Sequence, residues 1–314
     1  MMSESKPSEQ AVNQQLWRPN RQRSKLVELA VKSLFGLFAL VSVATTIGII
    51  FVLIFETLEF FREVPFWRFL TDKEWTPLFS NAKFGIFVLI SATFLTSVIA
   101  ITVALPVGLL AAIYLSEYAS PKLRQWLKPA LEILAGVPTV VYGYFALLFV
   151  TPLLQKFIPP LQGFNALSAG LVLGISIIPL VASLSEDAIY AVPQSLREGA
   201  YALGATQREA IIGVVLPGAL SGIVASFIIA VSRAIGETMI VAIAAGQNPT
   251  LGLNPFVPIM TMTAYIVQVS LGDTPAGSLA FKTIFAVGMT LFFLTLILNV
   301  FSFWFVRRFR EKYE

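Results

Sequence analysis

Two oppositely charged residues stand four positions apart in an otherwise apolar stretch of the sequence. Arg233 and Glu237 are the only charged residues between positions 210 and 272. A guanidinium offers a planar fork of N–H donors to an oxyanion, and a carboxylate one helical turn away could hold that fork when no anion is bound. Two hypotheses follow. Either Arg233, Glu237 and the adjacent Thr238 line a pathway for an anion, or the charges form a structural ion pair facing a partner chain.

The rest of the chain offers little for catalysis. It contains neither cysteine nor histidine, which excludes disulfides, metal or haem ligation by these residues, and Cys–His or Ser–His–Asp chemistry. A single acidic residue within a predicted span does not supply the set of catalytic groups that an intramembrane enzyme needs. We therefore expect no catalytic residue, no metal site and no cofactor in this chain.

The segment 186–217 carries signals for two short helices joined by a tight turn. Positions 195–198 read Ser-Leu-Arg-Glu and positions 206–209 read Thr-Gln-Arg-Glu, both with the spacing of a capping box. Gly204 lies between them, where a left-handed residue commonly ends a helix. The sequence thus predicts a helix–turn–helix loop with two capping boxes.

One face of the first predicted helix in this loop is apolar. Leu196, Ala200 and Leu203 follow the spacing i, i+4, i+7. An exposed apolar face on a polar loop favours contact with a partner protein. The alternative is an amphipathic loop that lies on the membrane surface.

The composition indicates that the helices carrying these residues lie in a membrane. The chain of 314 residues is 56% hydrophobic and only 13% charged, whereas soluble domains are about a quarter charged. A helix needs about 20 apolar residues to cross the hydrocarbon core. The charge-free windows predict an all-α membrane protein with six transmembrane helices, at roughly 31–55, 85–115, 131–154, 166–185, 219–245 and 283–305.

Basic residues set the predicted orientation. With both termini in the cytoplasm, inner segments carry 15 Lys and Arg and outer segments carry six, as the positive-inside rule demands. We therefore attribute the net charge of +4 to the membrane topology and to contact with membrane lipid, and not to nucleic-acid binding. We expect a polar, mostly disordered tail at 1–30, an external loop at 56–84, and a basic cytoplasmic C-terminus at 306–314.

Prolines interrupt several of these segments. Pro138 follows Gly136 and Val137 inside the third predicted span, which predicts either a kink packed on a neighbouring helix or a bend lining a pathway. Four prolines break the nearly uncharged segment 246–282. Its longest clean apolar stretch, 258–271, has 14 residues, and this length favours an interfacial or re-entrant segment over a seventh crossing.

The predicted loop resembles a known coupling element. Glu198, Gly199 and Ala200, then Gly204 after three residues, then Val214-Val215-Leu216-Pro217 after nine more, are similar to the EAA loop of type I ABC-importer permeases, which reads E-A-A-x3-G-x9-I-x-L-P. Gly199 replaces the first Ala and Val214 replaces Ile. The resemblance implies the ABC type-1 permease fold over 85–305. It also implies that Glu198, Gly199, Ala200, Gly204, Leu216 and Pro217 contact a cytoplasmic ATPase.

A second motif narrows the resemblance. Residues 232–239, Ser-Arg-Ala-Ile-Gly-Glu-Thr-Met, look like the R-x-x-G-E-T signature of phosphate ABC permeases. Three features resemble the PstC-type subunit more than the PstA-type. They are Ile235 and Met239 around this motif, the external loop, and the run from Glu186 to Pro193. The resemblance covers roughly residues 66–306.

This resemblance implies a set of partners. They are a homologous PstA-type permease, two ATPase subunits and an external phosphate-binding protein, in the plasma (inner) membrane of a prokaryote, with phosphate as the transported substrate. The chain has no G-x-x-x-x-G-K-[ST] motif, so ATP hydrolysis would belong to a separate subunit. The chain itself is then not an enzyme.

Two alternative functions remain open at this point. One is an ABC permease for another oxyanion, such as molybdate or sulfate. The other is a stand-alone secondary transporter or channel, although no inverted-repeat signal is evident.

Overall fold

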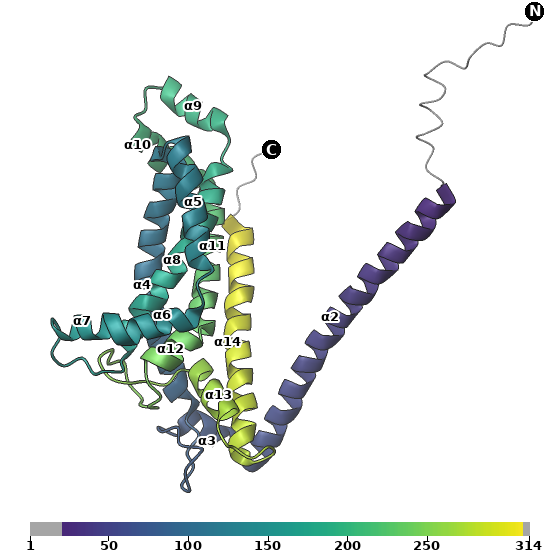
Figure 1. Cartoon of the computed structure of the whole chain (residues 1–314), viewed down its shortest axis with the longest axis vertical. Helices are drawn as coiled ribbons and strands as arrows, with labels where there is room; N and C mark the ends of the chain where they lie inside the picture. Colours follow the sequence, from purple (N-terminus) through teal and green to yellow (C-terminus); the bar gives the residue numbers. More distant parts are fainter. Residues whose placement is uncertain (1–20, 310–314) are drawn as a thin grey trace, which may run out of the picture. The chain divides into compact units, whose positions relative to one another are not determined.

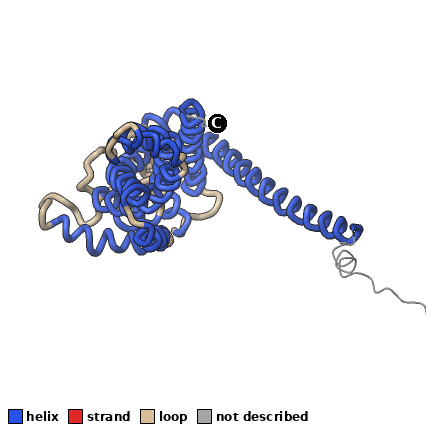
Figure 2. Tube along the Cα trace, turned by 90° about the horizontal axis from the view of Figure 1, so that it is seen from above, coloured by secondary structure: helices blue, strands red, loops and turns tan. Residues whose placement is uncertain are grey.

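The computed structural model describes residues 21–309, with side chains described from 25 to 304. The described part is helical apart from one isolated bridge between Trp75 and Phe84 (Figures 1 and 2). The chain divides into two compact units, of which the first ends at Phe55 and the second begins at Glu56. The predicted tail at 1–20 and residues 310–314 of the basic C-terminus lie outside the described residues.

The first unit contributes most of one long helix, α2 (Arg21–Glu63). This helix begins ten residues before the predicted span at 31–55, so residues 21–30 do not belong to a disordered tail. Within this unit its apolar side chains from Leu26 to Phe55 are almost all exposed, as expected for a helix whose apolar surface is covered inside a membrane. At 1.5 Å per residue, 43 residues extend about 65 Å, well beyond a hydrocarbon core of about 30 Å.

Three long helices form the centre of the second unit: α4 (Ile86–Ile113), α8 (Ala166–Tyr190) and α11 (Leu216–Gly236). Small residues let α4 and α8 approach closely. A Cβ added at Gly108 would lie 2.6 Å from Cβ of Val181, and one added at Gly174 would lie 2.7 Å from the carbonyl oxygen of Ala100. These glycines are therefore required by the packing of the two helices.

The third predicted span, 131–154, is wrong as a single helix. Helix α5 (Pro121–Ala135) ends before Gly136, and the chain resumes as α6 (Thr139–Phe145), the π-helix η2 (Ala146–Val150) and α7 (Thr151–Gln155) after a bend of 86°. Pro138 causes the break, because proline disfavours helical backbone at the preceding residue and donates no hydrogen bond. The predicted bend at this proline is confirmed, but it is much sharper than a kink.

The fifth predicted span, 219–245, also ends early. Its helix begins upstream, at α10 (Gln207–Ala210), and runs through the π-helix η3 (Ile211–Val215) and α11 to Gly236. Glu237 then adopts extended backbone, with ψ of 134°. A short helix, α12 (Met239–Ala244), follows. Apolar composition continues across this break, which is why the sequence pattern did not reveal it.

The remaining helices complete the second unit. Helix α13 (Met262–Leu271) has only ten residues and is too short to cross a membrane, in agreement with the expectation for 258–271. Helix α14 (Leu279–Phe309) is a full span. In all, the described residues contain five helices long and apolar enough to cross a membrane, or six if the bent pair counts as one crossing. The predicted number of six is thus matched only with the bent pair included.

An aromatic cluster organises the end of this unit opposite α9 (Figure 1). Phe60 at the end of α2, Phe69 in α3 (Phe66–Thr71), Trp75, Phe84 and Tyr265 in α13 pack mostly edge to face, with ring centroids 5.1–6.5 Å apart. Aromatic rings favour this geometry over a face-to-face sandwich. The predicted external loop is therefore a packed part of the unit.

Candidate coupling loop and translocation site

The turn of the predicted helix–turn–helix loop is confirmed. Helix α9 (Gln194–Ala202) ends next to Gly204, whose φ of +85° lies in the left-handed region. The N–H of Ala205 donates to the carbonyl of Ala200 over 3.1 Å, which closes the helix end. Glycine is favoured here because any side chain at positive φ is strained.

The two predicted capping boxes have different outcomes. The box at Thr206 is confirmed: the N–H of Glu209 donates to Thr206 Oγ1 over 3.4 Å, and the N–H of Thr206 donates to Glu209 Oε2 over 2.8 Å. The box at Ser195 is wrong, because α9 starts at Gln194, directly after Pro193 and two residues earlier than a cap at Ser195 requires. Ser195 is then already helical, and only a residue at the cap position can reach the third amide of the helix.

The second helix of the loop is longer than predicted. It does not end before Pro217 but continues as the helix from Gln207 to Gly236. Pro217 is the second residue of α11 and directly follows the π-helical stretch η3 within this continuous helix. A displacement of the loop would therefore act directly on a membrane-spanning helix.

The structure separates the six loop residues implied by the resemblance into exposed and packed ones. Glu198, Gly199, Gly204 and Pro217 are exposed, Ala200 is half-buried, and Leu216 packs against a buried cluster around Ile189 and Val215. Leu196 packs on the same cluster, whereas Leu203 is 91% exposed. The predicted apolar face is thus divided, and its C-terminal end offers a surface to a partner.

A buried ion pair beneath this loop was missed by sequence reasoning. Arg197 of α9 is buried, and its Nη2 lies 3.0 Å from Oε1 of Glu117 in the π-helix η1 (Tyr114–Tyr118), which directly follows α4. Nothing in the local sequence links two residues 80 positions apart. The only available signal was a conspicuous Arg inside the amphipathic helix.

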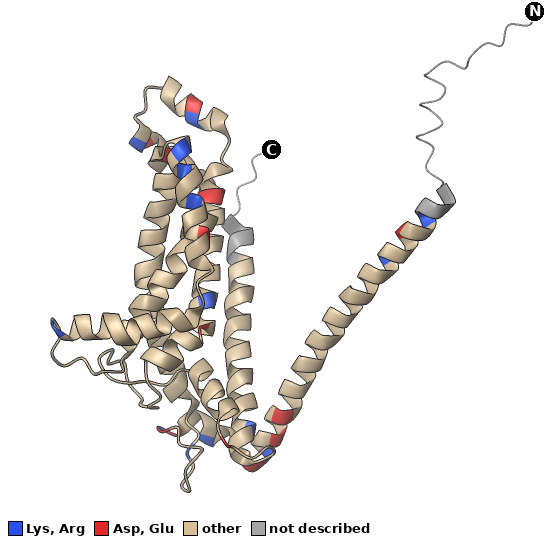
Figure 3. Ribbon diagram, in the orientation of Figure 1, with Lys and Arg blue, Asp and Glu red and all other residues tan. Residues whose placement is uncertain are grey.

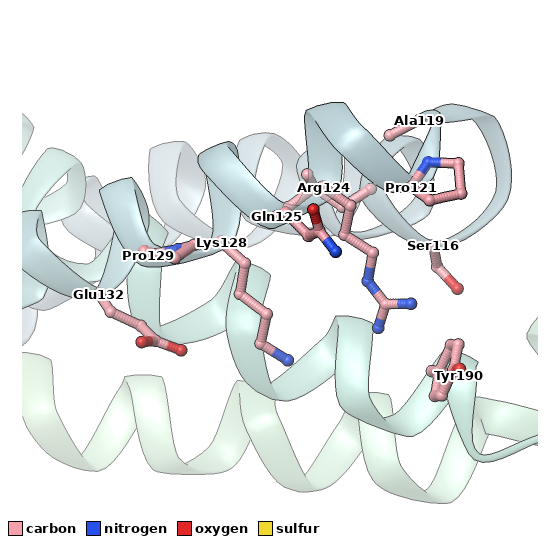
Figure 4. A pocket seen from close by; sticks show the side chains of 10 residues that line it. Ser116, Ala119, Pro121, Arg124, Gln125, Lys128, Pro129, Glu132 and Tyr190 are labelled. Carbon is pink, nitrogen blue, oxygen red and sulfur yellow. The ribbon is translucent and has the colours of Figure 1, made fainter.

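A second ionic cluster joins α5 to α8. Glu186 is only 1% exposed and accepts hydrogen bonds from Arg124 and from Lys128 Nζ, the latter over 2.7 Å; Lys128 also lies 2.7 Å from Asp187. The Arg124 guanidinium stacks 4.1 Å from the centroid of the Tyr190 ring. Figure 4 shows Arg124, Lys128 and Tyr190 on the wall of a cavity of about 660 Å³. No side chain of α5 is fully buried, so these charges hold the helix to α8.

The predicted ion pair between Arg233 and Glu237 is wrong. No hydrogen bond or ion pair joins them among the described side chains, because α11 ends at Gly236 and the two residues do not share one helix. Glu237 is only 9% exposed, and its Oε1 accepts from the N–H groups of Met239 and Ile240 over 3.2 and 3.4 Å. The carboxylate therefore serves the first turn of α12.

Arg233 and Thr238 lie on either side of this break. Arg233 is half-buried in the last turn of α11, where the helix dipole favours a cation. Its side chain has no hydrogen bond or ion pair with any described residue between 25 and 304. Thr238 Oγ1 donates to the carbonyl of Gly236 over 3.3 Å. The backbone carbonyl of Glu237 accepts from Thr263 Oγ1 over 2.7 Å, which ties the break to α13.

Comparisons with known proteins agree with this arrangement. Residues 104–312 match the family described as binding-protein-dependent transport system inner membrane component. The chain is 32% identical to the probable ABC transporter permease protein YqgH of Bacillus subtilis over 280 residues, covering 88% of this chain and 90% of that protein. It is 30% identical to the phosphate transport system permease protein PstC of Haemophilus influenzae over 295 residues, covering 88% and 92%.

The fold comparison leads to the same class. A chain of the inward-facing MetNI methionine ABC transporter superposes with a TM-score of 0.53 at 20% identity, covering 72% of this chain and 95% of that one. At this identity the likeness concerns the fold alone. Together with the match over more than half of the sequence, it leads to one conclusion: the chain belongs to the family of binding-protein-dependent transport system inner membrane components.

Proposed function

We propose that the chain is the PstC-type permease subunit of an ATP-driven phosphate importer. The observation that carries this proposal is the exposed turn formed by α9, Gly204 and α10, which presents the EAA-like residues at one end of a helical bundle. Its relatives named as phosphate permeases are similar over nearly their whole length. A permease needs such a loop because hydrolysis takes place on another polypeptide.

The proposed complex contains a homologous PstA-type permease, two cytoplasmic ATPase subunits and an external phosphate-binding protein. Both termini lie in the cytoplasm, and so does the loop around α9. This orientation is supported by the basic residues of α5, α9 and α10, which include Arg124, Lys128, Arg197 and Arg208, since positive charge is retained on the cytoplasmic side. Figure 3 shows Lys and Arg gathered at this end of the bundle.

Arg233 is the proposed anion-binding group of the pathway. Arg233 lies in the last turn of α11, and no counterion among the described residues neutralises it. Its guanidinium is therefore free to donate to an oxyanion. Thr238 lies at the break between α11 and α12. At membrane depth, irregular backbone occurs only where it is buried in protein or lines a cavity.

Uptake by the reconstituted complex tests the proposal. Proteoliposomes containing both permeases and the ATPase, supplied with the phosphate-binding protein, should accumulate phosphate only with internal ATP. Molybdate and sulfate should not compete at equal concentration. Uptake that persists without the ATPase subunits would show a stand-alone transporter, and uptake of molybdate or sulfate in place of phosphate would assign another oxyanion.

A further inference from the structure

One guanidinium beneath the coupling loop joins three helical elements. Arg197 projects from α9, and its side chain is only 10% exposed. Its Nη2 lies 3.0 Å from Glu117 Oε1 on η1 and donates over 2.8 Å to the carbonyl of Ile189 in the last turn of α8. Its Nη1 donates to the carbonyl of Val192, just beyond that helix. Two of these acceptors are backbone carbonyls, and the third is the carboxylate of Glu117, whose side chain is nearly buried.

The two carbonyl acceptors explain why an arginine occupies this position. The last carbonyls of a helix lack intrahelical donors and carry the negative end of the helix dipole. Arg197 neutralises this end of α8 and also pairs with Glu117, whose side chain is 7% exposed. Lysine has a single nitrogen and cannot reach separate acceptors with a rigid fork.

Glu117 is also tied to the other helix of the loop. Its backbone carbonyl accepts from Gln207 Nε2 over 2.8 Å at the start of α10. Both sides of the Gly204 turn therefore attach to the same residue of η1. A polar cavity of about 500 Å³ lies beneath α9, lined in part by Glu117, Arg197 and Gln207. These polar links add to the apolar contacts of Leu196 in holding the loop in place.

We propose that Arg197 is the positioning residue that passes displacements of the coupling helix α9 to α4, through η1, and to α8. This rests on the proposed function, in which the ATPase moves α9. Without the guanidinium, α9 would remain attached through the chain and Leu196, but it would move independently of α4 and α8. ATP hydrolysis would then continue without moving the pathway helices.

The first test measures phosphate transported per ATP hydrolysed by the full complex in proteoliposomes. Arg197→Gln should assemble and hydrolyse ATP, but its transport per ATP should fall about tenfold. The control is Lys122→Gln, which removes a positive charge from an exposed side chain of α5, outside the loop, that has no hydrogen bond or ion pair with any described residue. Its ratio should equal that of the wild type. An unchanged ratio in Arg197→Gln overturns the proposal.

Two further variants keep the test decisive if Arg197→Gln assembles poorly. Arg197→Lys retains the charge but loses the fork, and Glu117→Gln retains an oxygen acceptor but loses the negative charge. Each should lower transport per ATP by about threefold, with assembly intact. A purely structural role predicts fewer complexes with a normal ratio, and that result would overturn the proposal.

Amide hydrogen exchange on the same complex gives a readout that does not depend on the substrate. Amides of α9 should exchange about tenfold faster in Arg197→Gln than in the wild type, and those in Lys122→Gln should not. If the wild-type complex transports no phosphate, the proposed function fails while this comparison still decides the role of Arg197. Unchanged exchange in α9 overturns that role.

Discussion

Arg233 shows how much a single side chain depends on where its helix ends. As part of a continuous helix it would face Glu237 one turn away and be neutralised. The chain leaves the helix at Gly236, and Glu237 turns its carboxylate to the amides of α12 instead. The cation therefore remains without a counterion among the described side chains, which favours a role in binding an anion.

Arg233→Gln tests this role directly. Glutamine keeps hydrogen-bond donors and similar length but removes the charge, so the complex should assemble while phosphate uptake falls about a hundredfold. The measurement is uptake in a strain that lacks other phosphate importers, with the amount of complex determined in parallel. Near wild-type uptake with intact complex would leave Arg233 a structural residue only.

Glu237 should behave as a helix cap and not as a counterion. Glu237→Ala removes the acceptor for two amides at the start of α12 and should destabilise the protein by about 1–2 kcal/mol. Glu237→Gln keeps an acceptor oxygen and should lose less than half of that. Thermal unfolding of the purified complex measures both, and equal losses in the two variants would show that the charge itself matters.

The loop formed by α9 and α10 shows, at the scale of an element, that the role of a residue depends on where its helix begins. The T-x-x-E and S-x-x-E patterns are equally good signals, yet only the one at Thr206 forms a capping box. The difference lies in Pro193, which caps α9 two residues too early for Ser195 to act as the cap. A capping pattern thus predicts a helix start only where the preceding backbone leaves the cap residue extended.

Gly204→Val should separate insertion from coupling. At φ of +85° a β-branched residue is strained by about 1–3 kcal/mol, so the turn between α9 and α10 should open while the membrane helices still insert. The expected result is loss of the ATPase subunits on co-purification. Gly252→Val is the matched control, because a side chain there meets no atom within 4 Å and φ is not positive. Normal ATPase content in Gly204→Val would contradict the coupling role.

At the scale of the second unit, close helix packing depends on glycines distant from any charge. Gly108→Leu would place side-chain atoms into Val181 and force α4 and α8 apart, at a cost of about 1–3 kcal/mol. We expect a melting temperature lower by several degrees. Gly48→Leu, where a Cβ meets nothing within 4 Å, should leave the melting temperature unchanged. A similar effect in both variants would mean that leucine is disfavoured for another reason.

The sequence by itself determined the class of the protein, the number of apolar segments and the position of the Gly204 turn. These features depend on local properties: charge-free length, a left-handed glycine and a cap three residues from its partner. Motif spacing also located the loop and the signature around Arg233. Each motif of this kind lies within about 20 consecutive residues.

Tertiary structure alone decided where helices end inside apolar segments and which charges meet. The break at Glu237 lies in a run that is apolar apart from Arg233 and Glu237 themselves, so hydropathy does not detect it. Pro138 indicated a bend in the third span, but its angle of 86° came from the tertiary structure. The pairing of Arg197 with Glu117, and of Glu186 with Arg124 and Lys128, joins residues 58–80 positions apart. Buried charges must find partners, but which partner they find depends on how the helices pack, and no local pattern records that.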